Sequence, residues 1–168
     1  MNNKGFTLVE LLAVIVVLAI IVSIAVPSTV SISRKIKGNL FCQKVNLLVN
    51  AASLYGEDYK ETFGSKNYHI NSKTCVDSKT GQDYQVEGGN FNAQEITVSD
   101  LLSKGYVKKE KTEDGDVIDP RTNENMEQDK LIVYEKYGRI YVHFGELNGH
   151  ESARAKDANQ CIMTSECH

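Results

Sequence analysis

An almost wholly apolar stretch near the amino terminus constrains this chain more than any other feature. Phe6 to Val26 spans 21 residues whose one ionisable side chain is Glu10, and residues 11–33 carry no charge at all. A helix rises about 1.5 Å per residue, so this stretch would be roughly 30 Å long, which matches the hydrocarbon core of a bilayer. Lipid offers no partner to backbone polar groups, so the segment must be helical there. We expect a membrane-spanning helix; a buried core helix is the alternative, although such helices are rarely apolar on every side.

A second, amphipathic part of the same helix is predicted after Pro27. Proline removes one backbone donor and should kink the helix rather than end it. Apolar residues then recur at spacings of three and four, as in a helix with one buried face: Phe41, Val45, Leu48, Ala52 and Tyr55. Gly56 is a plausible C-cap. We therefore expect one long bent helix over residues 6–55, whose first half needs lipid or other subunits because the rest of the chain is too small to bury it.

The remaining residues predict a small head of mixed secondary structure. Residues 57–92 are polar and contain glycine, so we interpret them as a long loop region with one or two short strands. The capping-box residues Thr97 and Asp100 predict the start of a short helix. The other predicted elements are that helix over 99–104, turns at 113–116 and 119–120, strands over 131–136 and 139–144 joined as a hairpin at 137–138, and a helix over 152–158.

The overall charge and the scattered polar residues argue against several classes of function. The net charge is −3, so nucleic acid is not expected as a partner, because phosphate binding needs clustered Lys and Arg. The one basic cluster, within residues 34–37, directly follows the apolar stretch and fits contact with lipid headgroups. Three of the four histidines are scattered along the chain: His69, His143 and His150. We find no phosphate loop, nucleophile motif or catalytic carboxylate pair, and therefore expect neither an enzyme nor a cofactor.

Two groups of residues are candidates for metal binding or disulfide formation. Asp114, Asp116 and Asp119 do not match a calcium loop, so we interpret them as solvated turns. Four cysteines follow the apolar stretch: Cys42, Cys75, Cys161 and Cys167. An even number there fits disulfides in an oxidising compartment, with three pairings between which the sequence does not choose. A metal site at the carboxyl terminus, using Cys167 and His168, is the alternative, but its spacing fits no usual zinc pattern.

The residues in front of the apolar stretch form a specific motif. Residues 4–10 read KGFTLVE, and no small-residue cleavage site of the ordinary secretory kind follows the stretch. This arrangement resembles the cleavage and methylation motif of type IV prepilins and the related pseudopilins. The resemblance lies in Gly5 before the cut, Phe6 after it, Glu10 at the fifth mature position and Pro27 at the twenty-second. It implies that a prepilin peptidase cuts between Gly5 and Phe6 and that Phe6 is then N-methylated.

The resemblance also implies a fold and a division of the chain. The implied fold is α+β and lollipop-like, with a long bent N-terminal helix packed on a small antiparallel β-sheet. Residues 1–5 would be a leader peptide, and 6–27 would lie in the membrane and later in the filament core. Residues 28–56 would form the second half of the helix, and 57–168 the head.

The family further suggests a role for Glu10. The matching residue is proposed to pair with the amino group of Phe6 on a neighbouring subunit, which would neutralise both charges and set the axial register. A carboxylate within a membrane is costly, and less so near the edge where Glu10 would lie. A Glu10 side chain that reaches the headgroups is the alternative interpretation.

The resemblance favours one cysteine pairing without settling it. A Cys161–Cys167 bridge would close a small C-terminal loop like the disulfide-bounded region of many pilins. Cys42–Cys75 would then tie the loop region to the helix. A Cys75–Cys161 or Cys75–Cys167 bridge stays open, because the family usually places its C-terminal pair farther apart.

Two classes of function remain. The first is a structural filament subunit: a major pilin, a minor pilin, or a pseudopilin of a secretion or DNA-uptake machine. The second is a tip module in which residues 57–130 bind a surface, a polymer or DNA; a single-pass membrane protein with an incidental motif is a third. Expected partners are a prepilin peptidase, copies of the chain and other pilins, an assembly platform, and membrane lipid before assembly. We expect a single-pass protein with its head outside the cytoplasm and later a cell-surface filament, although the basic residues within 34–37 favour the opposite orientation.

Overall fold

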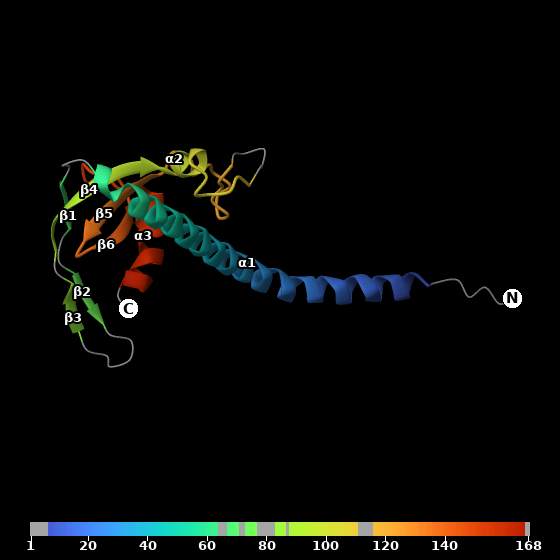
Figure 1. Cartoon of the computed structure of the whole chain (residues 1–168). Coiled ribbons are helices and arrows are strands. Elements are labelled where there is room, and N and C mark those ends of the chain that lie inside the picture. Colours follow the sequence, from blue (N-terminus) through green and yellow to red (C-terminus); the bar gives the residue numbers. More distant parts are fainter. Residues whose placement is uncertain are drawn as a thin grey trace. The chain divides into compact units, whose positions relative to one another are not determined.

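The chain contains one long N-terminal helix and a head built on an antiparallel sheet. The computed structural model in Figure 1 describes residues 7–63, 67–70, 73–76, 83–86, 88–110 and 116–166. The chain divides into two compact units, Met1–Asn39 and Leu40–His168, and the second unit is called the head below. Helix α1, Leu8–Tyr59, is 52 residues long and contributes to both.

Helix α1 confirms the predicted helix, but it ends later than expected. It continues through position 27, as predicted for a proline that does not end the helix, and it continues past Gly56 to Tyr59. A short 3-10 turn, η1 (Lys60–Thr62), follows. The prediction of a C-cap at Gly56 is therefore wrong. A Cβ at this position would lie 2.6 Å from Ile140 Cγ2 and 2.7 Å from Val133 Cγ1, so Gly56 allows close packing of the helix on the sheet.

The head contains a four-stranded antiparallel sheet with the order β1-β4-β5-β6, visible side by side in Figure 1. Its strands are β1 (Asn67–Ile70), β4 (Gly89–Thr97), β5 (Lys130–Lys136) and β6 (Arg139–Phe144). A separate antiparallel pair comprises β2 (Lys73–Val76) and β3 (Asp83–Val86). The chain thus has the α+β, pilin-like arrangement that was predicted, with more strand than expected between residues 67 and 97.

The β5–β6 hairpin confirms the sequence prediction. Lys136 pairs with Arg139, leaving a two-residue connection in which Tyr137 has φ 51° and Gly138 has φ 77°. Positive φ at both central residues matches the tight turn that suits the twist of antiparallel strands. The alternating residues Leu131 and Val133 are fully buried on the face that packs against α1.

The predicted capping box also forms. Helix α2, Val98–Ser103, starts after Thr97, whose backbone N–H donates to Asp100 Oδ2 at 2.8 Å. In return the Asp100 N–H donates to Thr97 Oγ1 at 3.2 Å. Gly105 follows with φ 81°, a left-handed conformation that suits glycine at a helix end.

The main core lies between the second half of α1 and the sheet. All five residues of the predicted helix face are at most 4% exposed: Phe41, Val45, Leu48, Ala52 and Tyr55. They belong to one cluster with residues of the sheet, α2 and α3 (Ala153–Glu166). The opposite sheet face carries a smaller cluster with stacked aromatic rings, in which Tyr134 and Tyr141 lie 5.6 Å apart. Burial of the predicted stripe therefore fixes how α1 meets the sheet within the head.

Candidate functional site

Helix α1 begins with a reciprocal capping box that involves the candidate assembly residue Glu10. The backbone N–H and the hydroxyl of Thr7 donate to Glu10 Oε2 at 2.9 and 3.0 Å. The Glu10 N–H donates to Thr7 Oγ1 at 3.3 Å. These bonds satisfy donors that a helix start would otherwise leave without a partner, and a carboxylate there also interacts favourably with the helix dipole. The chain itself thus orients Glu10, which remains exposed.

Thr7 is a partner of Glu10 that was not predicted from the sequence. Glu10 was expected to contact a neighbouring subunit, and no partner three residues earlier was expected. A Thr followed by Glu at that spacing is a capping-box pattern, the same type of signal that located Thr97 and Asp100. The signal was present but lay inside a motif interpreted for cleavage, methylation and contact with a neighbouring subunit.

The first half of α1 has an apolar surface that nothing in the described chain covers. Its large apolar side chains between residues 8 and 22 are each 49–79% exposed: Leu8, Val9, Leu11, Leu12, Val14, Ile15, Val16, Val17, Leu18, Ile20, Ile21 and Val22. They lie on every side of the helix. Monomeric soluble proteins rarely expose so large a contiguous apolar patch, so this surface points to contact with lipid or other protein chains.

The expected processing residues, Gly5 and Phe6, lie outside the residues that the structure describes. The side chain of Pro27, an expected assembly residue, also lies outside the description. The cut between Gly5 and Phe6 therefore stays a prediction. Among the candidate site residues of the apolar segment, Glu10 is the one whose side-chain contacts the structure describes.

The cysteine pairing corrects the sequence prediction. Cys42 on α1 forms a disulfide with Cys161 on α3, and their Cα atoms are 5.2 Å apart. The favoured Cys161–Cys167 and Cys42–Cys75 bridges are both wrong, as is Cys75–Cys161, because each would use a cysteine already paired. Sequence analysis expected a loop after residue 158, whereas α3 continues to Glu166 and packs Cys161 against α1. The side chains of Cys75 and Cys167 lie outside the described residues.

Asp119, in the predicted turn, belongs to a network of charged side chains. Asp119 is fully buried and accepts hydrogen bonds from the backbone N–H, Nε and Nη2 of Arg121 at 2.8–3.2 Å. Arg154 Nε lies 3.6 Å from the same carboxylate. Burial alone would raise the pKa of Asp119, but the two guanidinium groups hold it below its ordinary value. The Arg121 guanidinium also lies over the Phe41 ring at 3.4 Å, so the network fastens this turn to α1.

Since two arginines already neutralise Asp119, its carboxylate is not set up for a calcium ion. The described residues contain no group of three or more His, Cys, Asp or Glu side chains that could hold a metal. Residues 111–115, including Asp114, lie outside the description. His143 is occupied as well, since its Nε2 lies 2.7 Å from Glu151 Oε1.

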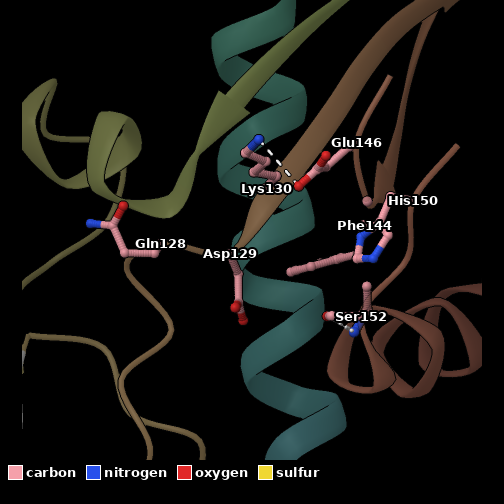
Figure 2. Close-up of a pocket in the computed structure, with 9 residues that line it drawn as sticks. Gln128, Asp129, Lys130, Phe144, Glu146, His150 and Ser152 are labelled. Atoms are coloured by element: carbon pink, nitrogen blue, oxygen red, sulfur yellow. Dashed lines mark hydrogen bonds and ion pairs between the residues drawn. The ribbon is translucent and has the colours of Figure 1, made fainter. Parts of the chain in front are cut away.

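A small polar pocket of about 160 Å³ lies where β5, β6 and α3 meet (Figure 2). Lys130 and Glu146 form an ion pair at 3.2 Å beside it, and Ser152 Oγ accepts the backbone N–H of Ala155 at 3.1 Å. Burial raises the pKa of Asp129, and its attraction to the Arg154 guanidinium does not fully offset that effect. The charged groups and the hydroxyl around this pocket thus support the fold.

The amino-terminal part of the chain matches a known family model. Residues 1–26 match the family described as Prokaryotic N-terminal methylation motif. The chain carries the signature of type IV pilins and pseudopilins. Proteins with this motif are structural pilins rather than enzymes. Searches of curated proteins and of solved structures found no match for the chain.

Within the described residues, no helix meets the length and hydropathy required to cross a membrane. The single-span topology expected from the sequence is therefore not confirmed and stays a prediction.

Proposed function

We propose that this chain is a structural subunit of a type IV pilus or a related filament. A prepilin peptidase cuts it between Gly5 and Phe6, and it assembles through its apolar N-terminal helix. The observation that carries the proposal is the methylation motif over residues 1–26, continuous with a helix whose apolar side chains are uncovered.

The physics of the apolar helix supports assembly. In lipid, a helix gains little hydrophobic free energy when it meets another helix, so side-chain packing and polar contacts must drive association. The segment after Glu10 offers packing on all sides and carries no charge through residue 33. Before assembly the segment lies in the membrane, and afterwards neighbouring subunits replace the lipid.

Glu10 is the polar contact of this assembly. Its carboxylate lies at the start of α1 and is exposed, so it is available to the Phe6 amino group of a neighbouring subunit. That pair would neutralise two charges within an apolar surrounding and define the axial position of one subunit against the next.

The disulfide supports the proposed location of the head. Disulfides persist in oxidising compartments and are rare in the cytosol. Cys42–Cys161 lies within the head, so we place the head outside the cytoplasm, against the orientation that the basic residues within 34–37 favour.

The test is N-terminal sequencing and intact-mass measurement of protein sheared from the cell surface. The proposal expects a chain that begins at Phe6, carries one methyl group and is abundant in the filament fraction. A chain that retains residues 1–5, or that never enters this fraction, contradicts the proposal. Presence at a few copies per filament would leave processing intact but refute a role as the main subunit.

A matched pair of variants tests Glu10. Glu10→Ala is expected to reach the membrane normally but to yield few or no filaments. Glu61→Ala, which removes an exposed glutamate from the head, is the control and should assemble as the wild type does. Normal filaments from Glu10→Ala would exclude the pairing role.

A further inference from the structure

The sheet face opposite α1 is aromatic, although the second face of an antiparallel sheet is commonly polar. Successive side chains of a strand alternate between the two faces, and a face in contact with water usually carries polar residues. Here each strand of the four-stranded sheet contributes a ring: Tyr68, Phe91, Tyr134 and Tyr141. Tyr134 is 6% exposed, and its ring centroid lies 5.6–5.9 Å from those of the other three. Burial of Tyr134 therefore accounts for the packing of these four rings.

Tyr137, at the tip of the β5–β6 hairpin, is not explained by that packing. It is 79% exposed, and its φ of 51° lies in the left-handed region, which bulky side chains rarely adopt. Asparagine, aspartate or glycine is the usual residue at this position of such a turn. Lys136 Nζ lies 5.6 Å from the ring centroid, but most of the ring surface stays open. An unfavourable backbone conformation that presents an exposed ring points to a binding role.

Positive charge lies beside this exposed ring. Lys136 Nζ is also 5.2 Å from the Phe91 ring centroid, so the ammonium group contacts two rings. Arg139 pairs with Lys136 across the hairpin, so both side chains belong to the same sheet face. Arg139 is exposed and forms no ion pair with the residues that the structure describes. Glu95, a carboxylate on this face, is already paired with Lys130 at 3.2 Å.

We propose that this end of the sheet binds an acidic polysaccharide built from uronic acids. The binding surface, called the aromatic patch, comprises Phe91, Lys136, Tyr137, Arg139 and Tyr141. The C–H groups on the face of a sugar ring carry a partial positive charge and suit the negative face of a tyrosine ring. The Arg139 guanidinium can donate two parallel hydrogen bonds to a uronate carboxylate. The proposal concerns the head alone and does not rest on filament assembly.

The charges favour a polysaccharide over a single-stranded nucleic acid, which also combines flat rings with negative charge. A nucleic acid carries one phosphate per nucleotide, and proteins that bind it follow its backbone with a positively charged groove. The aromatic patch has two cations, Lys136 and Arg139, and the whole chain has a net charge of −3. A polymer with fewer charges along its length fits this surface better.

Isothermal titration calorimetry of the full chain tests the proposal, in a polyoxyethylene detergent that carries no sugar. The titrants are two uronic-acid chains, oligogalacturonate and an alginate oligomer, with a neutral galactose oligomer and oligothymidylate for comparison. We expect at least one uronic-acid oligomer to bind, and the neutral oligomer to bind at least about fivefold more weakly because it lacks the carboxylate that meets Arg139. Oligothymidylate should also bind more weakly. No binding of either uronic-acid oligomer, equal binding of the neutral oligomer, or equal or tighter binding of oligothymidylate would overturn the proposal.

Tyr137→Asn and Arg139→Gln test whether the aromatic patch is the site. Asparagine suits this turn and accepts positive φ, so Tyr137→Asn should keep the hairpin and leave the thermal midpoint unchanged or higher. Each variant should bind the uronic-acid oligomer roughly fivefold more weakly than the wild type. Lys156→Gln removes an exposed cation from α3, so it is the matched control for Arg139→Gln and should bind normally. Wild-type affinity in either patch variant, or an equal loss in Lys156→Gln, would show that the site is not there.

Discussion

The close approach at Gly56 makes a quantitative prediction about how α1 packs on the sheet. In Gly56→Ala, the new Cβ would lie 2.6 Å from Ile140 Cγ2 and 2.7 Å from Val133 Cγ1. Both neighbours are β-branched side chains with restricted χ1 angles, and Val133 is fully buried, so neither methyl group can move away freely. The helix or the strands must shift instead.

The expected magnitude follows from two opposing effects. Adding a methyl group to a well-packed core costs about 1–3 kcal/mol. Replacing glycine by alanine inside a helix raises the unfolding free energy by at most about 1 kcal/mol. The gain is smaller near Tyr59, where α1 ends. The net loss of unfolding free energy is therefore roughly 0–3 kcal/mol. Gly38→Ala is the matched control in the same helix, because a Cβ there meets nothing within 4 Å, and it should leave stability unchanged or raise it.

The assay is thermal or urea unfolding of the full chain in detergent, followed by the near-ultraviolet circular dichroism of its tyrosines. For a chain of this size, each 1 kcal/mol shifts the thermal midpoint by about 2–4 °C. Combining Gly56→Ala with Ile140→Ala should reduce the penalty of the first substitution, since the closest contact is then absent. A midpoint for Gly56→Ala equal to or above that of Gly38→Ala would refute the packing argument.

Three further predictions concern the head. Thr97→Ala removes the N-cap of α2 and should cost about 1 kcal/mol of unfolding free energy, measured by urea titration. Joint replacement of Cys42 and Cys161 by alanine opens a disulfide that spans 119 residues, so the loss should approach about 5 kcal/mol in the chain-entropy model; a urea midpoint unchanged under non-reducing conditions would contradict it. A hydrogen bond to Asp58, with burial and the Asp58 charge, raises the pKa of Tyr106 to about 12. Folding therefore favours the neutral phenol, and the stability this contributes is present below the ordinary tyrosine pKa near 10 and is lost as the pH rises through about 12. Absorbance titration should show a late-titrating tyrosine in the wild type that is lost in Asp58→Ala.

Local patterns in the sequence predicted the parts of the fold that depend on neighbouring residues. The spacing of Phe41, Val45 and Leu48 predicted the buried face of α1, because helical periodicity alone determines which side chains share a side. Two strand-like runs separated by Tyr137 and Gly138 predicted the hairpin, and the tight turn forms there with positive φ at both residues.

Contacts between distant residues could not be predicted in this way. The partner of Cys42 depends on where α3 docks, and that helix is weakly amphipathic in sequence and was expected to end at residue 158. The role of Gly56 depends on Ile140, which lies far along the chain. Strand β4 was not located from the sequence, because Gly89, Asn90 and Asn92 are typical of loops. Its pairing partners also lie elsewhere in the chain: residues 89–92 pair with β1, and residues 93–97 pair with β5.

The capping box at Thr7 changes how the effect of Glu10 on assembly must be tested. Glu10 has two separable properties: its side-chain oxygen accepts hydrogen bonds from Thr7, and its negative charge could meet the Phe6 amine of a neighbour. Glu10→Ala removes both, so a defect in that variant does not say which one matters. Glu10→Gln keeps an oxygen acceptor at the same helix position, and glutamine suits a capping box as glutamate does, but the charge is gone. If charge pairing drives assembly, Glu10→Gln should yield as few filaments as Glu10→Ala. If Glu10→Gln assembles like the wild type while Glu10→Ala does not, Glu10 acts by capping the start of α1, and pairing with the amine is refuted.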